Sequence, residues 1–398
     1  MPVSRRTALL GIATNASLGR TTLALAAGSG DKRLIVVILR GALDGMAAVV
    51  PYGDAGLGVL RAEIVPPEPD QPDGLLDLGG FFGLHPALTG LHEMYKLNEA
   101  LAVHAVAGAY RVRSHFEAQD YLESGADHRM TSGWLNRAVA SLPPAGTRKA
   151  EADALAIGVS VPLLLRGPAA VANWAPHEFS QPAPDLYATI AALNKTDPVT
   201  GPAIAEGLRA RNFSTSVMDG GDEVKQKYAF PALAHAAGEM LRAPDGPRIA
   251  ALEIGGWDTH AAQPNRLTEP LKQLDAGLVA LKTALGPSWT KTAVLVMTEF
   301  GRTARVNGTK GTDHGTGTVA FVLGGAVAGG QIKTTWPGLR PGQLFENRDL
   351  APTTDLRAVA KGLMAAHLGL DAAALGQVFP SSEGVGPMRG LIRVWLFR

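Results

Sequence analysis

Residues 34–45 read Leu-Ile-Val-Val-Ile-Leu-Arg-Gly-Ala-Leu-Asp-Gly. Six consecutive apolar residues, four of them β-branched, end abruptly at Arg40 and Gly41, and Asp44 follows shortly after. A short apolar run bounded in this way is typical of a strand that is buried on both faces, as in a parallel sheet. The stretch therefore predicts a central strand over residues 34–39 with a polar loop at its carboxyl end.

Four further apolar runs of strand length occur along the chain, at residues 101–107, 249–254, 293–297 and 318–323. Apolar residues recur at helical spacing between them, in residues 86–97, 115–123, 232–242, 269–285 and 356–368. Strands that alternate with helices form sheets covered on both faces. The pattern predicts an α/β fold, a three-layer sandwich with a mostly parallel central sheet.

The chain has 398 residues, of which 46% are hydrophobic and 18% charged, so it can bury a large core. These totals favour a single domain over residues 31–398. Residues 181–227 begin with prolines and lack a β pattern, which predicts a helical insertion there.

Charge and cysteine content exclude several classes of function. The 37 basic and 36 acidic residues give a net charge of +1, so we expect no nucleic-acid partner. The chain has no cysteine, which excludes disulfides, thiol nucleophiles and thiolate metal sites. Any metal ion must therefore be bound by His, Asp or Glu.

The N-terminus resembles a twin-arginine leader over residues 1–30. Arg5 and Arg6 precede a mildly apolar stretch that ends near Ala26, where we expect cleavage. This predicts the twin-arginine export machinery as a partner and a periplasmic or secreted location. Two alternative interpretations stay open: the N-terminus is a disordered basic arm, or the protein is a cytosolic enzyme whose resemblance to a leader is accidental. No other segment has the run of about 18 apolar residues that a stable membrane span needs.

Acidic residues and histidines collect near the ends of the predicted strands. Asp258 and His260 follow residues 249–254, Glu299 follows residues 293–297, and Asp313 and His314 stand before residues 318–323. Loops at the carboxyl ends of parallel strands converge and bind ligands. Carboxylates and imidazoles in such loops can hold one or two divalent cations, with zinc, manganese, magnesium and calcium all open. The candidate ligands are Asp44, Asp258, His260, Glu299, Asp313 and His314.

Ser114 and Arg113 are the candidate catalytic residues. Ser114 follows a predicted strand and opens a predicted helix, a position that favours anionic groups. Its hydroxyl could attack phosphorus, or it could cap the helix in a capping box with Glu117. Arg113 could clamp an oxyanion or lie in solvent.

Six ordered motifs, together with residues 348–357, resemble the sulfatase-like domain-of-unknown-function 1501 family, a group of twin-arginine-exported bacterial proteins placed in the alkaline-phosphatase-like superfamily. These motifs are Arg40-Gly-Ala-Leu-Asp44-Gly, Ser114-His-Phe-Glu-Ala-Gln-Asp120-Tyr, Gly133-Trp-Leu-Asn-Arg137, Gly255-Gly-Trp-Asp258-Thr-His260, Thr298-Glu-Phe-Gly-Arg302 and Gly311-Thr-Asp-His314-Gly. The resemblance implies an alkaline-phosphatase-like fold and a metal-activated nucleophile at a helix N-terminus.

By that resemblance, Asp44 is a first-strand metal ligand, Ser114 occupies the nucleophile position, and Asp258, His260 and His314 are further ligands. Glu299 stands where the superfamily places an Asp-His pair. The implied function is an exported metal-dependent hydrolase of a phosphate-type ester, on a small molecule or a glycan. Sulfate esters are less favoured, because Ser114 lacks the motif that is converted to formylglycine. The alternative is a non-catalytic cell-surface protein that binds a polymer or partner and retains the superfamily fold.

Overall fold

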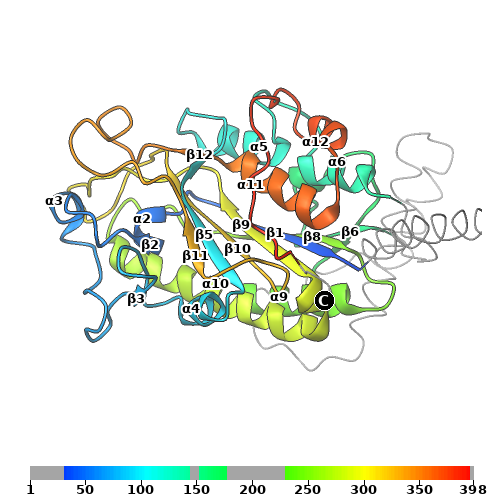
Figure 1. Ribbon diagram of the computed structural model, residues 1–398, viewed down its shortest axis with the longest axis horizontal. Coiled ribbons are helices and arrows are strands. Elements are labelled where there is room, and N and C mark those ends of the chain that lie inside the picture. The colour runs from blue at the N-terminus through cyan, green and yellow to red at the C-terminus, as the bar shows by residue number, and fades with distance from the viewer. Residues whose placement is uncertain (1–30, 144–151, 177–228, 395–398) are drawn as a thin grey trace, which may run out of the picture.

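The computed structural model describes residues 31–143, 152–176 and 229–394. The predicted leader at 1–30 and the predicted helical insertion at 181–227 lie outside the described residues. Figure 1 shows the described part as a twisted central sheet with helices on both of its faces. Among the described helices, none combines the length and the apolar character that crossing a membrane requires.

A nine-stranded sheet forms the centre of the described structure, in the order β11-β5-β10-β9-β1-β8-β6-β7, with β12 paired to β5. Its strands are β1 (Arg33–Leu39), β5 (Ala100–Ala107), β6 (Ala154–Ile157), β7 (Val171–Trp174), β8 (Ile249–Ile254), β9 (Thr292–Thr298), β10 (Thr318–Leu323), β11 (Gln331–Lys333) and β12 (Thr354–Asp355). Each of the five predicted strands is present. The central strand β1 pairs in parallel with β8 and β9. The predicted α/β class with a mostly parallel central sheet is confirmed.

Strand β10 runs antiparallel to both of its neighbours, β9 and β5. Its first residue, Thr318, therefore pairs with Val106 near the carboxyl end of β5. The sequence does not predict this direction. All six residues of β10 are buried, and a uniformly apolar run does not indicate which way its strand runs in the sheet. As a result, the loop before β10 lies at the same edge as the loops that follow β1, β5, β8 and β9.

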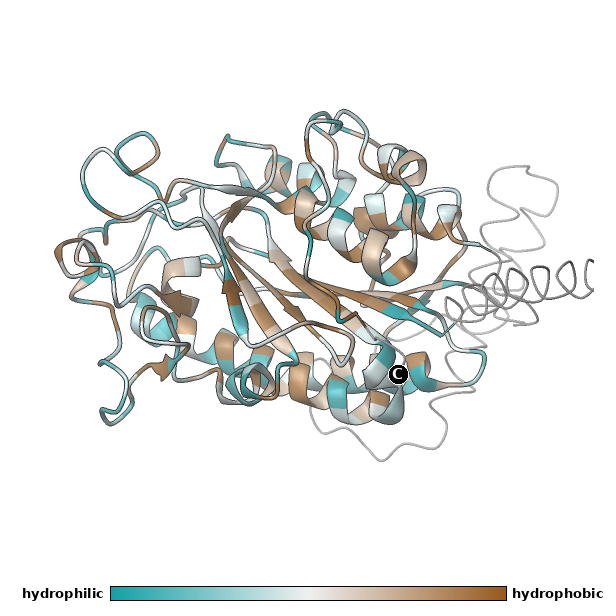
Figure 2. Cartoon of the chain, viewed as in Figure 1, coloured by the Kyte–Doolittle hydropathy of each residue, from teal (hydrophilic) through white to brown (hydrophobic). Residues whose placement is uncertain are grey.

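Two hydrophobic cores lie on the two faces of the sheet, because successive side chains of a strand point to opposite sides. Ile35 and Val37 of β1 belong to one core, and Leu34, Val36 and Ile38 belong to the other. Figure 2 shows the hydrophobic side of the helices turned toward the sheet. One face is covered by α4 (Thr89–Lys96), α9 (Phe230–Arg242) and α10 (Gln263–Leu285), and the other by α5 (His115–Ser124), α6 (Trp134–Ser141), α11 (Leu356–Leu363) and α12 (Ala372–Val378).

The five predicted helices are present with shifted ends, whereas α6 and α12 were not predicted. Helix α10 begins at Gln263, six residues before the predicted start, and carries Pro264 in its first turn, where proline is tolerated. A π-helical turn at Met364–Leu368 extends α11. Strands β6 and β7 were missed because each has only four residues. Smaller elements lie beside the sheet: α2 (Gly45–Ala48), α3 (Leu57–Arg61) and the three-stranded sheet of β2 (Val49–Val50), β3 (Leu76–Asp77) and β4 (Gly83–Leu84).

Candidate metal centre

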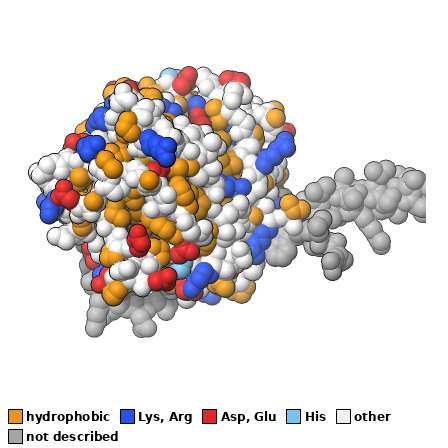
Figure 3. All heavy atoms as spheres, turned by 60° about the vertical axis from the view of Figure 1, so that its left-hand side comes forward, with side chains coloured by type: hydrophobic (Ala, Val, Ile, Leu, Met, Phe, Trp, Pro, Cys, Tyr) orange, Lys and Arg blue, Asp and Glu red, His pale blue; other side chains and the backbone are white. Residues whose placement is uncertain are grey.

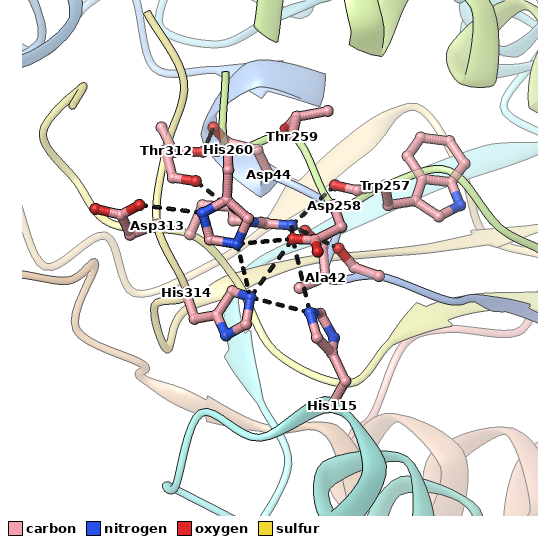
Figure 4. A network of polar contacts seen from close by, with 12 residues as sticks. Ala42, Asp44, His115, Trp257, Asp258, Thr259, His260, Thr312, Asp313 and His314 are labelled. Atoms are coloured by element: carbon pink, nitrogen blue, oxygen red, sulfur yellow. Dashed lines mark hydrogen bonds and ion pairs between the residues drawn. The ribbon is translucent and has the colours of Figure 1, made fainter. Parts of the chain in front are cut away.

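Three histidines and one aspartate converge at the carboxyl edge of the sheet (Figure 4). The Nε2 atom of His314 lies 3.0 Å from Nε2 of His115 and 3.0 Å from Nε2 of His260. Oδ1 of Asp258 lies 3.0 Å from Nε2 of His260, 3.4 Å from that of His314 and 3.6 Å from that of His115. His115, Asp258 and His314 form a group able to hold a metal ion, and His260 adjoins it.

The topology of the sheet brings these four residues together. His115 is the first residue of α5 and follows β5, while Asp258 and His260 lie in the loop after β8. His314 lies just before β10, which starts at this edge because it runs antiparallel. The site therefore forms where the carboxyl ends of parallel strands meet the start of the reversed strand, an edge at which α/β proteins bind ligands.

Each of the three imidazoles is oriented by an oxygen atom on its other nitrogen. Nδ1 of His115 lies 2.9 Å from Oε1 of Glu299, and Nδ1 of His260 lies 3.1 Å from Oδ1 of Asp313. Nδ1 of His314 lies 2.9 Å from the backbone oxygen of Arg113. These oxygens can only accept, so each Nδ1 carries the proton and each Nε2 presents a lone pair. Metal-binding histidines are held in this way.

Hydrogen bonds alone do not account for the contacts among the Nε2 atoms. His314 Nε2 has a single lone pair and faces two other imidazole nitrogens at 3.0 Å and a carboxylate oxygen at 3.4 Å. Tetrahedral ligands about 2.0–2.1 Å from a zinc ion place their donor atoms about 3.3 Å apart. The separations among His115, Asp258 and His314, 3.0 to 3.6 Å, are close to that value, and His260 lies 3.0 Å from both Asp258 and His314. A cation among the four donors would remove the repulsion between their lone pairs. The donor set therefore fits a divalent ion such as zinc.

The four donor residues are partly exposed, so the site reaches the surface. The exposed fractions of the side chains are 48% for Asp258, 44% for His260, 25% for His314 and 23% for His115. Burial alone would raise the pKa of Asp258, but the hydrogen bond and charge of Arg302 outweigh it and lower that pKa. The hydrogen bond from His115 to Glu299 raises the pKa of the imidazole, whereas burial lowers the pKa of His314.

Glu299 is a buried orienting group and contacts His115 from behind. Its Oε1 atom accepts hydrogen bonds from His115, from the backbone N–H of Gly41 and from Gln119. Burial works to raise its pKa, yet the hydrogen bonds, led by that of His115, lower the pKa to about 2. Asp313 orients His260 in the same way. Glu299 and Asp313 thus lie behind the imidazoles and not among the four converging donors.

Arg302 connects the loops that carry the site. Its Nη2 atom lies 2.5 Å from Oδ1 of Asp258. Its fully buried guanidinium also donates hydrogen bonds to four backbone oxygens, those of Gly41, Ala42, Trp257 and Thr312. These oxygens belong to the loops after β1 and β8 and the loop before β10. Arg302 therefore fixes the three loops relative to one another.

Gly311 permits the close packing of two of these loops. A Cβ atom on Gly311 would lie 2.2 Å from the backbone oxygen of His260. Any larger residue would force the loop that carries His314 away from the loop that carries Asp258 and His260.

Asp44 lies in a separate buried network. Its Oδ2 atom lies 2.7 Å from Nη1 of Arg61 and accepts a hydrogen bond from Gln263. Both side chains of the ion pair are 1% exposed. The carboxylate of Asp44 therefore already has a cation beside it, and the structure does not bring it into the group of four donors. Gln263 also contacts Thr259 and Thr312, so this network supports the two ligand loops from behind.

Ser114 and Arg113 lie directly before His115. Ser114 is the residue before α5, and its side chain makes no capping hydrogen bond to that helix. Glu117, the other member of the predicted capping box, bonds instead to the hydroxyl of Tyr110. The Arg113 guanidinium pairs with Asp349 and Glu346, so it is neither a solvent-exposed free cation nor aimed at the four donors.

His115 is the one donor that the sequence did not single out. Ser114-His-Phe-Glu matches the pattern of a helix N-terminus, and that pattern gives no sign that its histidine is a ligand. The available signal was its place: like Asp258 and His260, it follows a buried strand at the carboxyl edge of the sheet.

Several solved structures are similar to this chain. The phosphonate monoester hydrolase of Agrobacterium radiobacter is 10% identical, with 90% of this chain and 79% of that chain covered and a TM-score of 0.37. A protein in the alkaline phosphatase superfamily from Vibrio parahaemolyticus is 11% identical, with 74% and 60% covered and a TM-score of 0.32. The C-terminal periplasmic domain of EcEptC from Escherichia coli, in complex with Zn, is 9% identical, with 74% and 72% covered and a TM-score of 0.32. This chain therefore spans less than two thirds of the Vibrio protein. No match occurs among curated proteins.

The family model described as "Protein of unknown function (DUF1501)" matches residues 101–379. The match spans more than half of the chain and includes all four converging residues, His115, Asp258, His260 and His314. The sequence motifs around these residues resemble the same family. The chain therefore belongs to the DUF1501 family.

Proposed function

We propose that this protein is a metal-dependent hydrolase of a phosphate-type ester, with one divalent cation held by His115, Asp258, His260 and His314. The observation that carries the proposal is the convergence of three Nε2 atoms and one carboxylate oxygen whose contacts hydrogen bonds cannot satisfy. A bound cation at this place supplies Lewis acidity toward an ester oxygen. The partial exposure of Asp258 and His260 leaves a substrate group room to approach.

Ser114 is the proposed nucleophile. It adjoins His115 in the chain, and its side chain does not cap α5. The free N–H groups and the dipole of the first turn of α5 favour an anionic group near Ser114, as a phosphoryl group would be. Because Arg113 is paired with Asp349 and Glu346, its proposed part is to place the backbone oxygen that orients His314.

The preference for phosphate over sulfate esters rests on the sequence. The chain has no cysteine, and Ser114 is followed by His-Phe-Glu in place of a formylglycine motif. The proposed substrates are small-molecule or glycan esters. The proposal also includes export by the twin-arginine machinery to the periplasm or beyond, which rests on Arg5, Arg6 and the apolar stretch that ends near Ala26. N-terminal sequencing of the protein from its native host tests this part, since an intact N-terminus contradicts it.

The enzymatic proposal is tested with the purified protein. We expect elemental analysis to find a bound divalent ion and a panel of phosphate monoesters, diesters and phosphonates to include at least one that is cleaved. Ser114→Ala should abolish turnover and leave the metal content unchanged, whereas Ser132→Ala, a serine in the loop before α6, should leave both unchanged. Absence of both bound metal and turnover across zinc, manganese, magnesium and calcium contradicts the proposal.

A second candidate function is a non-catalytic protein that binds a surface polymer or a partner. The observation that favours it is the number of protein side chains at the site: His115, Asp258, His260 and His314 are enough for a closed shell of four ligands, and a closed shell is typical of a structural site. Metal content without turnover, together with wild-type biological activity of Ser114→Ala, would support this candidate. Loss of turnover in Ser114→Ala excludes it.

A further inference from the structure

A groove lies on the face of the molecule formed by α3 and the loop around Leu339. Its cavity volume is about 520 Å³, within the range of about 300–1,000 Å³ of small-molecule sites. Figure 3 brings this side forward and shows hydrophobic side chains gathered in the middle of the face with charged side chains around them. The groove shares no lining residue with the candidate metal centre.

The apolar lining of the groove is aliphatic. It includes Val59 and Leu60 of α3 and, from the loop around Leu339, Leu339, Pro341 and Leu344. Leu60 and Leu339 are buried and anchor the walls in a small core, whereas the Val59 side chain is 72% exposed. No aromatic side chain lines the groove, so it offers no platform for stacking a sugar or a base. An aliphatic lining of this kind matches a hydrocarbon chain.

Two arginines, Arg305 and Arg340, also line the groove, together with Ala55, Gly56 and Asn347, and the lining contains no acidic residue. Within the described residues, neither guanidinium pairs with a carboxylate. Nη1 of Arg305 lies 3.4 Å from the backbone oxygen of Val59, and the Arg340 side chain has no hydrogen-bond partner there. Guanidinium groups bind carboxylate and phosphate groups through paired hydrogen bonds. The groove therefore combines an apolar wall with unneutralised positive charge.

We propose that this groove binds an anionic amphiphile, an aliphatic chain that ends in a carboxylate or a phosphate group. The chain lies against Val59, Leu339 and Leu344, and the anionic group pairs with Arg305 and Arg340. The site is separate from the candidate metal centre and does not depend on the proposed hydrolase function.

The test is calorimetric titration of the full-length protein with dodecanoate and with dodecyl phosphate, both below their micelle concentrations. We expect at least one of these two ligands to bind. The double variant Arg305→Gln/Arg340→Gln should raise the Kd of the bound ligand at least tenfold. Val59→Asp, a surface change that places a negative charge in the groove, should do the same. The matched control is Arg266→Gln, since Arg266 is an exposed arginine of α10 outside the groove.

Ligand controls separate the two parts of the proposal. Butanoate should bind at least tenfold more weakly than dodecanoate, because it lacks the chain, and so should the uncharged dodecyl maltoside, because it lacks the anion. Tighter binding of dodecanoate than of dodecyl phosphate supports the proposal with a fatty acid as the source. Tighter binding of dodecyl phosphate supports it with a phospholipid as the source. His115→Ala should leave the affinity unchanged. Equal binding of the uncharged ligand, or wild-type affinity in the double arginine variant, overturns the proposal.

Discussion

The Nε2 atoms of His115 and His314 lie 3.0 Å apart, although 199 positions of the chain separate the two residues. His115 opens the helix that follows β5, and His314 precedes β10, which pairs with β5 in the opposite direction. An antiparallel partner begins where its neighbour ends, so the residue before one strand meets the residue after the other. This relationship creates the donor cluster from which the following predictions derive.

Replacing His115 with alanine removes one of four donors and should weaken metal binding at least about 100-fold, since loss of an orienting group alone costs about 10–100-fold. Equilibrium dialysis followed by elemental analysis measures the effect. His128→Ala is the control, because His128 is exposed and, within the described part of the chain, pairs with Asp127 alone. Wild-type metal content in His115→Ala would falsify the assignment of His115.

Replacing Glu299 with glutamine should weaken metal binding about 10–100-fold while the fold is retained. The amide still accepts a hydrogen bond from His115, but the negative charge that makes the imidazole a stronger donor to a cation is lost. Metal titration measures the change, with Glu269→Gln on the exposed side of α10 as the control. An unchanged affinity contradicts the orienting role.

Replacing Arg302 with methionine should lower the free energy of unfolding by an amount on the order of 3 kcal/mol, because several backbone oxygens lose a buried donor. The loops that carry Asp258 and His314 should also lose their relative position, so metal affinity should fall in the fraction that stays folded. Urea unfolding of the metal-free protein and metal titration separate the two effects. Arg266→Met is the control, and wild-type metal affinity in Arg302→Met contradicts the positioning role.

Replacing Asp44 with asparagine should leave the metal content at one ion per chain, because Arg61 already neutralises Asp44. The same change should lower the free energy of unfolding by about 3–5 kcal/mol, since it leaves the Arg61 charge buried without its partner. Elemental analysis and urea unfolding on the same sample measure both quantities. A loss of one ion from folded protein would instead restore Asp44 as a ligand.

The protein should lose stability as the pH falls from about 6.5 to about 4, through His104 and His367. Burial lowers the pKa of each imidazole to about 4, from 6.5. Between these values the unfolded chain binds more protons than the folded one, so acidification favours unfolding, by an amount on the order of 3 kcal/mol for each group. Urea unfolding at pH 7.5 and pH 4.5 measures the loss. His104→Gln should reduce this pH dependence, and an unchanged slope would contradict the prediction.

The sequence by itself determined the five longest strands of the sheet, though not the four shorter ones, and the edge at which the chemistry collects. Residues 34–39 and 293–297 are continuous apolar runs, and only burial on both faces satisfies such runs. Asp258, His260 and His314 were identified from the same local signal, a polar residue next to a buried strand.

The tertiary structure alone decided which of the candidate residues share a site. Asp44 and Glu299 carry carboxylates that could bind a metal ion, yet Arg61 pairs with Asp44 and His115 with Glu299. Arg61 lies 17 residues after Asp44, and His115 lies 184 residues before Glu299. His115 became a donor only because β10 runs antiparallel and brings His314 to it. Pairing between distant segments depends on strand order and direction, and a buried run of β-branched residues carries neither.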